Sequence, residues 1–132
     1  MQKEDFLLKH IEFFFNLLKK IVGINFEDIK MEELESIYDE FLRKNFGVKI
    51  YEIDEIEIEK YKHLLFDESH RNIMVLFFLR ISKFYRKNQP ILSVKYFELA
   101  KKISEYHYKS VKLIKDKIDL EVEELFEELK QD

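Results

Sequence analysis

The chain contains no cysteine, threonine or tryptophan, and its 132 residues include only two glycines and one proline. Without cysteine it can form neither disulfides nor thiolate metal sites, and a reducing cytoplasm is the compartment we expect. Scarce glycine and proline leave little material for turns, which argues against a β or loop-rich fold. Gly23 and Gly47 stand far apart, each after an expected helix, so no glycine-rich phosphate loop or dinucleotide fingerprint is present.

Bulky apolar residues and charges make up most of the chain. Hydrophobic residues account for 46% of the sequence and charged residues for 38%. Ala100 is the only alanine, so helix propensity must come from Leu, Glu and Lys, and the core from Phe, Ile and Tyr. A chain of this length is typical of one domain with a core of its own. We expect a single all-α domain over residues 1–132, a bundle of five or six helices with a frayed acidic end at about 127–132.

No targeting or membrane-spanning segment is expected near the start of the chain. Glu4 and Asp5 stand where a signal peptide would need a basic region. Glu12, Lys19 and Lys20 interrupt the apolar run that follows, so this run does not suit a membrane span. Many residues have AT-rich codons (Lys, Ile, Phe, Tyr and Asn), which suggests a bacterial host. We therefore expect a bacterial cytoplasmic protein without membrane attachment.

Charge is segregated along the chain, although the net charge is only −4. Residues 27–59 carry −8 (four basic and 12 acidic side chains), whereas residues 60–117 carry +9 (14 basic and five acidic). Residues 118–132 are acidic again, at −6 (one basic and seven acidic). One interpretation is that acidic and basic helices pack side by side and neutralise each other. The alternative is a basic segment that faces an anionic partner such as nucleic acid or an acidic peptide.

Hydrophobic periodicity and terminal residues predict the helices. They are expected at about Glu4–Val22, Met31–Asn45, Ser69–Lys87 with Ser69 as the cap, Pro90–His107 and Ser110–Lys130. Residues 48–60 are ambiguous, because Ile56 and Ile58 alternate as they would in a strand. With no second β-like run to pair with, a helix capped by Asp54 is the better interpretation.

The helices differ in the burial that their sequences predict. The run Ile73–Leu79 is apolar all round, which is typical of a central helix contacted on every side. The first helix is apolar over well over half its circumference, more than the stripe of roughly 100° that one contact needs. It therefore requires cover on two sides, from other helices or from a partner chain. In the last two helices the expected buried residues are Val94, Phe97, Ala100 and Ile103, and then Val111, Ile114, Ile118, Val122, Leu125 and Leu129.

The stretch around residues 73–105 resembles one tetratricopeptide-type repeat, an antiparallel pair of helices. The matching positions are Phe84 and Tyr85 as late aromatics, Asn88 at the turn, Ser93 and Ala100 at small-residue sites, and Phe97 at the aromatic site. Ile81 departs from the pattern, because a small residue is usual there, and so does Glu105, where proline often ends the repeat. No second copy follows, whereas a repeat array needs about three. The resemblance implies one tetratricopeptide-like hairpin in the C-terminal half of a globular bundle.

A second resemblance concerns Glu4–Phe14, EDFLLKHIEFF. This stretch is similar to the opening of a family of small, uncharacterised helical bacterial proteins that end in a repeat-like hairpin. The family implies a fold and carries no activity that transfers to this chain.

The sequence offers few candidates for chemistry. None of the six serines stands in a nucleophile-elbow motif, so we predict no catalytic residue. Two acid–histidine pairs have spacings that would place both side chains on one helix face: Asp67 with His70, and Glu59 with His63. A single pair of this kind is not a metal centre. We accordingly predict no metal and no cofactor.

The favoured interpretation is a non-catalytic protein-interaction or scaffolding module. Arg80, Lys83 and Lys87 form a basic stripe on one predicted helix and are the candidate binding site for an acidic partner segment. Homodimerisation through the broad apolar face of the first helix is the rival within this class. Two alternatives stay open: a small-molecule-binding domain or enzyme with an apolar interhelical pocket, and a nucleic-acid-associated protein that uses the basic segment 60–117.

Overall fold

Helices account for nearly all of the structure, a computed structural model that describes residues 3–65, 67–105 and 116–130. No strand occurs in these ranges, which confirms the predicted all-α fold class. The α-helices in these ranges are α1 (Lys3–Val22), α2 (Met31–Phe46), α3 (Glu68–Tyr85), α4 (Pro90–Glu105) and α5 (Lys117–Lys130). Short 3-10 helices lie in the connections between the first three α-helices: η1 (Phe26–Asp28) between α1 and α2, and η2 (Ile50–Glu55) and η3 (Ile58–Leu64) between α2 and α3.

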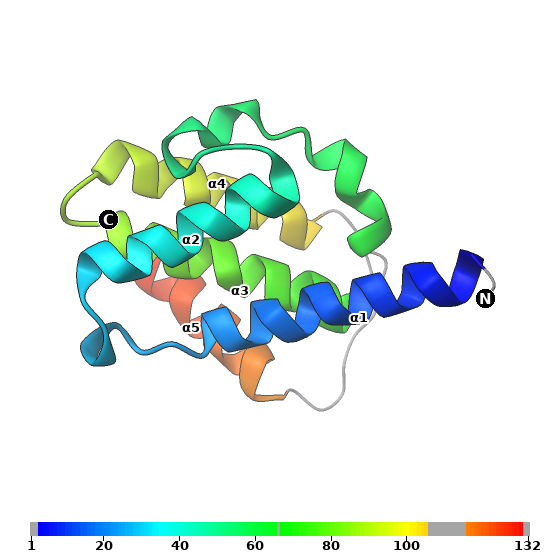
Figure 1. Cartoon of the computed structure of the whole chain (residues 1–132). Helices are drawn as coiled ribbons and strands as arrows, with labels where there is room; N and C mark the ends of the chain where they lie inside the picture. Colours follow the sequence, from blue (N-terminus) through cyan, green and yellow to red (C-terminus); the bar gives the residue numbers. More distant parts are fainter. Residues whose placement is uncertain (1–2, 66, 106–115, 131–132) are drawn as a thin grey trace.

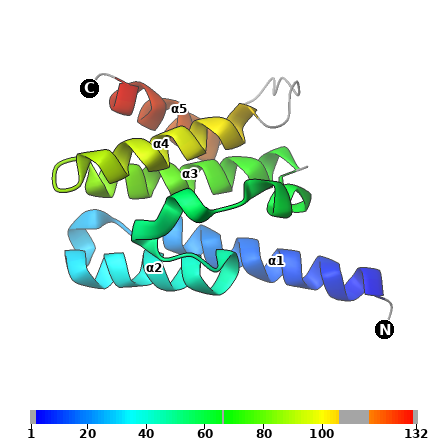
Figure 2. The ribbon, with the colours of Figure 1, turned by 90° about the horizontal axis from the view of Figure 1, so that it is seen from above.

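α3 is the central helix of the bundle. It contacts α1 on one side and α4 and α5 on the other, while α1 and α2 lie next to each other as one outer layer (Figures 1 and 2). The run Ile73–Leu79 is buried throughout, with no side chain more than 2% exposed. Tyr38 and Phe41 on α2 pack their rings against Phe77 of this run, at centroid distances of 5.9 and 5.0 Å. The predicted central helix is therefore confirmed.

The N-cap of α3 lies two residues before the predicted one. The cap is Asp67, whose Oδ1 accepts the backbone N–H of His70 at 3.2 Å, so the prediction of Ser69 as the cap is wrong. Aspartate and serine both suit a cap, and here the Asp67 carboxylate accepts one of the free N–H groups of the first turn. A carboxylate also interacts more favourably than a hydroxyl with the positive end of the helix dipole.

Residues 48–65 form two 3-10 turns rather than the predicted α-helix, and Asp54 is not a cap. The backbone leaves helical geometry at Glu52, and distant side chains complete the hydrogen bonds around Ile50. The N–H of Ile50 donates to Asp39 Oδ1 at 2.8 Å, and the hydroxyl of Tyr96 donates to its carbonyl at 2.7 Å. These partners hold the segment against α2 and α4 without a continuous helix.

The α3–α4 hairpin is antiparallel and closes through two buried serines. Ser82 Oγ donates to the Ser93 carbonyl at 2.7 Å, and Ser93 Oγ donates to the Ser82 carbonyl at 2.6 Å. Ser93 and Ala100 are buried, as expected for small residues at a close helix contact. The small residue that faces Ser93 from α3 is Ser82, one position after Ile81. The predicted burial of Val94 is wrong, since its side chain is exposed and Tyr96 is buried instead.

The acidic helix α5 covers the remaining side of α3. Val122 and Leu125 are buried as predicted, and Ile118 and Leu129 are partly buried against the core. The predicted buried residues Val111 and Ile114 lie outside the described ranges. α5 is helical as far as Lys130.

Candidate functional site

The predicted basic stripe lies at the carboxyl end of α3, but its three members have different surroundings. Arg80 and Lys83 belong to the helix, whereas Lys87 follows its last residue, Tyr85. Arg80 is mostly covered: its Nε lies 3.2 Å from Glu121 Oε2 of α5, and its guanidinium lies 5.7 Å from the centre of the Phe26 ring. The two charged atoms are buried and lack hydrogen-bond geometry, so they interact as an ion pair. Arg80 therefore belongs to the packing of α5 on α3.

Lys83 and Lys87 remain at the surface. Lys83 Nζ lies 3.4 Å from Glu128 Oε2 of α5, and both side chains are about two-fifths exposed, at 41% and 44%. Arg86, which the sequence analysis did not single out, approaches the same carboxylate at 3.9 Å. Lys87 is exposed and makes no ion pair with any residue that the structure describes. Of the predicted stripe, Lys83 and Lys87 are thus accessible to a partner, with Arg86 beside them.

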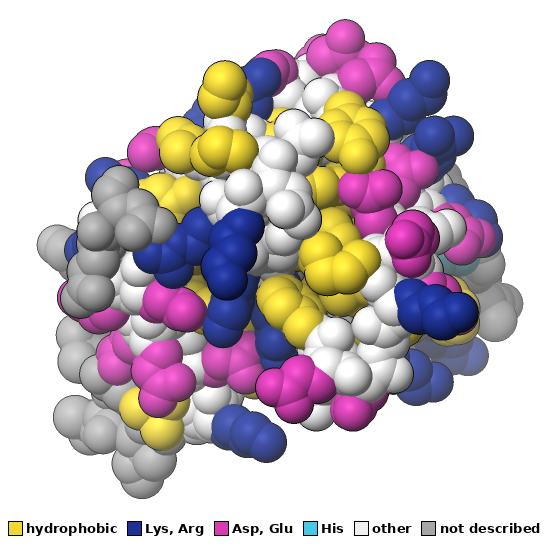
Figure 3. Space-filling model, turned by 90° about the vertical axis from the view of Figure 1, so that its left-hand side faces the viewer, with side chains coloured by type: hydrophobic (Ala, Val, Ile, Leu, Met, Phe, Trp, Pro, Cys, Tyr) yellow, Lys and Arg dark blue, Asp and Glu magenta, His cyan; other side chains and the backbone are white. Residues whose placement is uncertain are grey.

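A groove of about 540 Å³ runs along these cations. Phe26 from η1, Met31 from α2 and Phe84 from α3 supply its apolar lining, and Lys83, Arg86, Lys87 and Glu128 supply its charged lining. Figure 3 shows this end of the molecule, where basic and hydrophobic side chains lie beside one another and acidic ones surround them. No local pattern links residues 26–31 with residues 83–88. Only the packing of α1, α2 and α3 brings them together.

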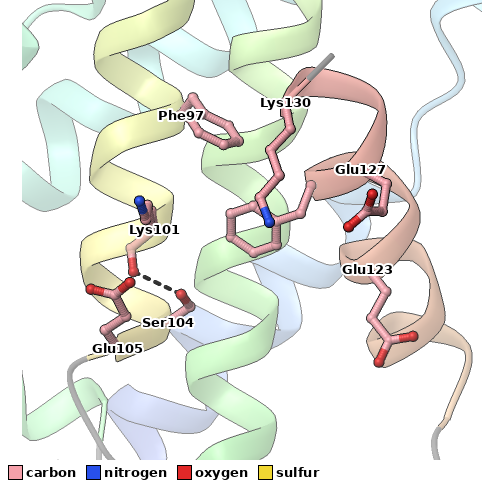
Figure 4. A pocket seen from close by; sticks show the side chains of 8 residues that line it. Phe97, Lys101, Ser104, Glu105, Glu123, Glu127 and Lys130 are labelled. Carbon is pink, nitrogen blue, oxygen red and sulfur yellow. Dashed lines mark hydrogen bonds between the residues drawn. The ribbon is translucent and has the colours of Figure 1, made fainter.

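A second cavity of about 480 Å³ lies between α4 and α5. The rings of Phe97 and Phe126 meet edge to face in it, with centroids 5.7 Å apart. Acidic and basic side chains of both helices surround these rings (Figure 4). Ser104 lines the cavity, but its hydroxyl donates to the Lys101 carbonyl at 2.7 Å, so this serine is not paired with a base.

The only carboxylate that receives two phenolic hydroxyls in the described ranges is Glu35 on α2. Tyr51 and Tyr85 each donate to its Oε2 at 2.8 Å, which links η2, α2 and α3. Burial raises the pKa of the Tyr85 hydroxyl well above its ordinary value of 10.0, and the hydrogen bond to Glu35 raises it further. For the exposed Tyr51, the hydrogen bond to Glu35 is the main cause of a raised pKa. Both hydroxyls therefore stay protonated at neutral pH and act as structural donors.

Asp67 and His70, one of the two pairs singled out in the sequence, both take part in packing and capping. Asp67 caps α3, and the ring of His70 stacks on Phe15 with centroids 3.9 Å apart. Within the described parts of the chain, no three His, Asp or Glu side chains are grouped so that they could hold a metal ion. In the same ranges, no helix combines the length and the apolar character needed to cross a bilayer.

Comparison with protein-family models, curated proteins and solved structures gives no match for this chain. The resemblances to the tetratricopeptide repeat and to the small bacterial family therefore stay predictions. The functional assignment depends on the geometry of the groove and of the exposed faces.

Proposed function

We propose that this chain is a non-catalytic helical interaction module that binds an acidic segment of a partner protein in the groove at the end of α3. The composition of the groove carries the proposal: Phe26, Met31 and Phe84 line its apolar part, and cations stand at its edge. Apolar pockets supply the desolvated contacts of an interface, while charges at the rim steer the approach of the partner.

The contacts of Glu128 indicate what the groove recognises. This one carboxylate lies within 3.4 Å of Lys83 and 3.9 Å of Arg86, so the site already accommodates an acidic side chain on a helix. Lys87 extends the basic edge beyond the reach of Glu128. A partner segment with carboxylates beside an apolar residue would place its charges on Lys87 and Lys83 and its apolar side chain on Phe26 and Phe84. Such binding weakens as salt screens the charges.

Charge reversal of the two exposed lysines tests this proposal. We expect the variant Lys83→Glu/Lys87→Glu to bind its partner about tenfold or more weakly, because two attractive rim charges become repulsive. The matched control is Lys102→Glu, which reverses an exposed lysine on α4, away from the groove. Affinity capture from a native-host extract, followed by mass spectrometry, compares the three proteins.

A protein retained by the wild type and by Lys102→Glu, lost with the double variant and released by salt, supports the groove. Capture profiles that are the same for all three proteins overturn it. Because Lys83 also pairs with Glu128, circular dichroism must show that the double variant is folded, and Lys87→Glu alone serves as the milder variant.

A second candidate function is small-molecule binding in the cavity between α4 and α5. Its support is the pair of rings, Phe97 and Phe126, with lysine and glutamate side chains around them. This site fits a ligand with an aromatic or aliphatic body and polar ends. A thermal-shift screen against metabolites tests it: stabilisation lost in Phe97→Ala supports the pocket, and flat curves throughout count against it.

A further inference from the structure

α1 keeps an uncovered apolar face on the outer layer of the bundle. Phe13 is 71% exposed and Leu17, one turn later, is 39% exposed. Their neighbours Phe15 and Leu18 are buried against the core. No described element lies in front of α1 and α2 in the view of Figure 1. α2 and α3 thus cover two sides of α1, but in the described part of the chain nothing covers the face that carries Phe13 and Leu17.

The same face carries a cavity. Leu17, Ile21, Ile37 and Phe41 line a space of about 230 Å³ between α1 and α2, with Glu40, Lys44 and Asn45 completing its lining. A dry apolar cavity of roughly 150 Å³ is enough to hold a benzene molecule. The space therefore has room for a phenyl ring, and Phe13 presents one a single helical turn away from Leu17. A projecting ring and a matching cavity on one surface make that surface self-complementary.

We propose that this face is a homodimer interface in which two α1 helices pack antiparallel about a two-fold axis near residues 15 and 16. Each Phe13 ring then enters the cavity between α1 and α2 of the other copy. A two-fold contact uses every such interaction twice, so two aromatic anchors are buried in one interface. This surface shares no residue with the groove at the end of α3, and the proposal stands independently of the function assigned to that groove.

The charges beside Phe13 favour the antiparallel arrangement. Glu12 and Lys19 are both exposed and stand seven residues apart, which places them on the same edge of α1. In an antiparallel pair with its axis midway between them, Glu12 of each copy lies opposite Lys19 of the other. A parallel pair would instead place like charges opposite each other, which is unfavourable.

The other exposed apolar pair in the described ranges lacks this complementarity. Ile91 and Val94 on α4 are 76% and 58% exposed. The cavity next to Val94 is smaller, about 180 Å³, and its lining includes Ser82, Ser93 and Arg86. Ile91 and Val94 are aliphatic and present no ring that could enter a cavity of a second copy, and Ile91 does not line this cavity. Ile91 therefore provides a matched control for Phe13: similarly exposed, apolar and helical, but without a ring.

Sedimentation equilibrium from low to several hundred micromolar protein tests the interface. We expect the wild type and Ile91→Asp to dimerise with the same dissociation constant. Phe13→Asp should raise that constant at least about 30-fold, because a buried aromatic anchor is replaced by a charge. A wild type that is monomeric at every concentration overturns the proposal, and so does a Phe13→Asp variant that dimerises as well as the wild type.

Two further variants keep the test decisive if Phe13→Asp fails to fold. Since the chain has no cysteine, Asn16→Cys places a single exposed thiol beside the proposed axis, and Val94→Cys places one on α4 as control. Under mild oxidation only Asn16→Cys should give a disulfide-linked dimer.

In addition, Glu12→Lys and Lys19→Glu should each weaken dimerisation about threefold to tenfold, and the double variant should restore it. Equal cross-linking of the two cysteine variants, or a double variant no better than either single one, overturns the antiparallel dimer.

Discussion

α1 and α3 are both apolar around most of their circumference, yet the bundle covers them very differently. α3 contacts α1, α4 and α5, and every side chain of Ile73–Leu79 is at most 2% exposed. α1 packs against α2 and α3, yet Phe13 on its outward face remains 71% exposed. The apolar width of a helix thus indicates how much cover it needs, while its place in the fold decides how much of that cover the chain itself provides. The difference between the two helices points to a surface that a second molecule can cover.

The charged edges of the two helices show the same contrast. Arg80 on α3 lies against Glu121 of α5 and is largely withdrawn from solvent. Glu12 and Lys19 on α1 are both exposed. The acidic helix α5 therefore neutralises part of the basic α3 within the chain, which agrees with the first of the two interpretations of the charge segregation. At α3 only the far end, around Lys83 and Lys87, keeps basic side chains at the surface.

The strongest test of this comparison is the loss of a ring from the centre of α3. Phe77→Ala should lower the free energy of unfolding by about 3–5 kcal/mol, because it removes a fully buried ring and leaves a cavity. Tyr38, Phe41 and Phe78 all lose a ring contact. Urea unfolding, followed by circular dichroism, measures the change.

The control for Phe77→Ala is Ile91→Ala, whose side chain is 76% exposed. It should change the free energy of unfolding by less than about 0.5 kcal/mol. Similar losses for both variants would mean that the position of α3 at the centre of the bundle is incorrect.

An intermediate effect is expected from the buried tyrosines at alkaline pH. Burial raises the pKa of Tyr38, Tyr85 and Tyr96 above the ordinary value of 10.0. Below that value both the folded and the unfolded chain keep these hydroxyls protonated, and stability is unaffected. Above it the unfolded chain loses protons that the folded chain retains. The free energy of unfolding should then fall by up to about 1.4 kcal/mol per pH unit for each buried tyrosine.

Two tyrosines that bind the same carboxylate allow the effect of burial on the tyrosine pKa to be separated from the effect of the hydrogen bond. Tyr85 is buried and Tyr51 is 56% exposed, although both donate to Glu35. In urea unfolding between about pH 8.5 and pH 11, Tyr85→Phe should reduce the alkaline slope by one tyrosine's share, and Tyr51→Phe should reduce it less. Equal reductions would show that the hydrogen bond, rather than burial, dominates the pKa of Tyr85.

Local features of the sequence were sufficient to predict the helices but not the contacts between them. The start of α2 at Met31 and of α4 at Pro90 follows from periodicity and terminal residues, which are local signals. The two turns of η2 and η3 could not be predicted in this way. Two side chains hydrogen-bond the backbone of Ile50 and hold this segment in place. They are Asp39 and Tyr96, which lie 11 and 46 residues away in the sequence.

The candidate sites show the same limit. Spacing alone placed Arg80, Lys83 and Lys87 on one stripe, but it could not show that α5 would cover Arg80. It also missed Arg86, because the carboxylate of Glu128 that this residue approaches lies on another helix. For α1, in contrast, the excess apolar width was visible in the sequence, and the structure adds which residues remain uncovered.

The smallest effect on stability is expected at the exposed face of α1, and it separates an interface residue from a core residue. Phe13→Ser should change the free energy of unfolding by less than about 0.5 kcal/mol, because the ring of an isolated copy contacts mainly water. The measurement must be made at protein concentrations below the dimer dissociation constant, since dimerisation otherwise adds to the apparent stability. At higher concentrations the wild type should unfold at increasingly higher urea, whereas Phe13→Ser should not. A loss of about 2 kcal/mol or more in the dilute variant would instead mean that Phe13 packs within its own chain, and the contrast between α1 and α3 would disappear.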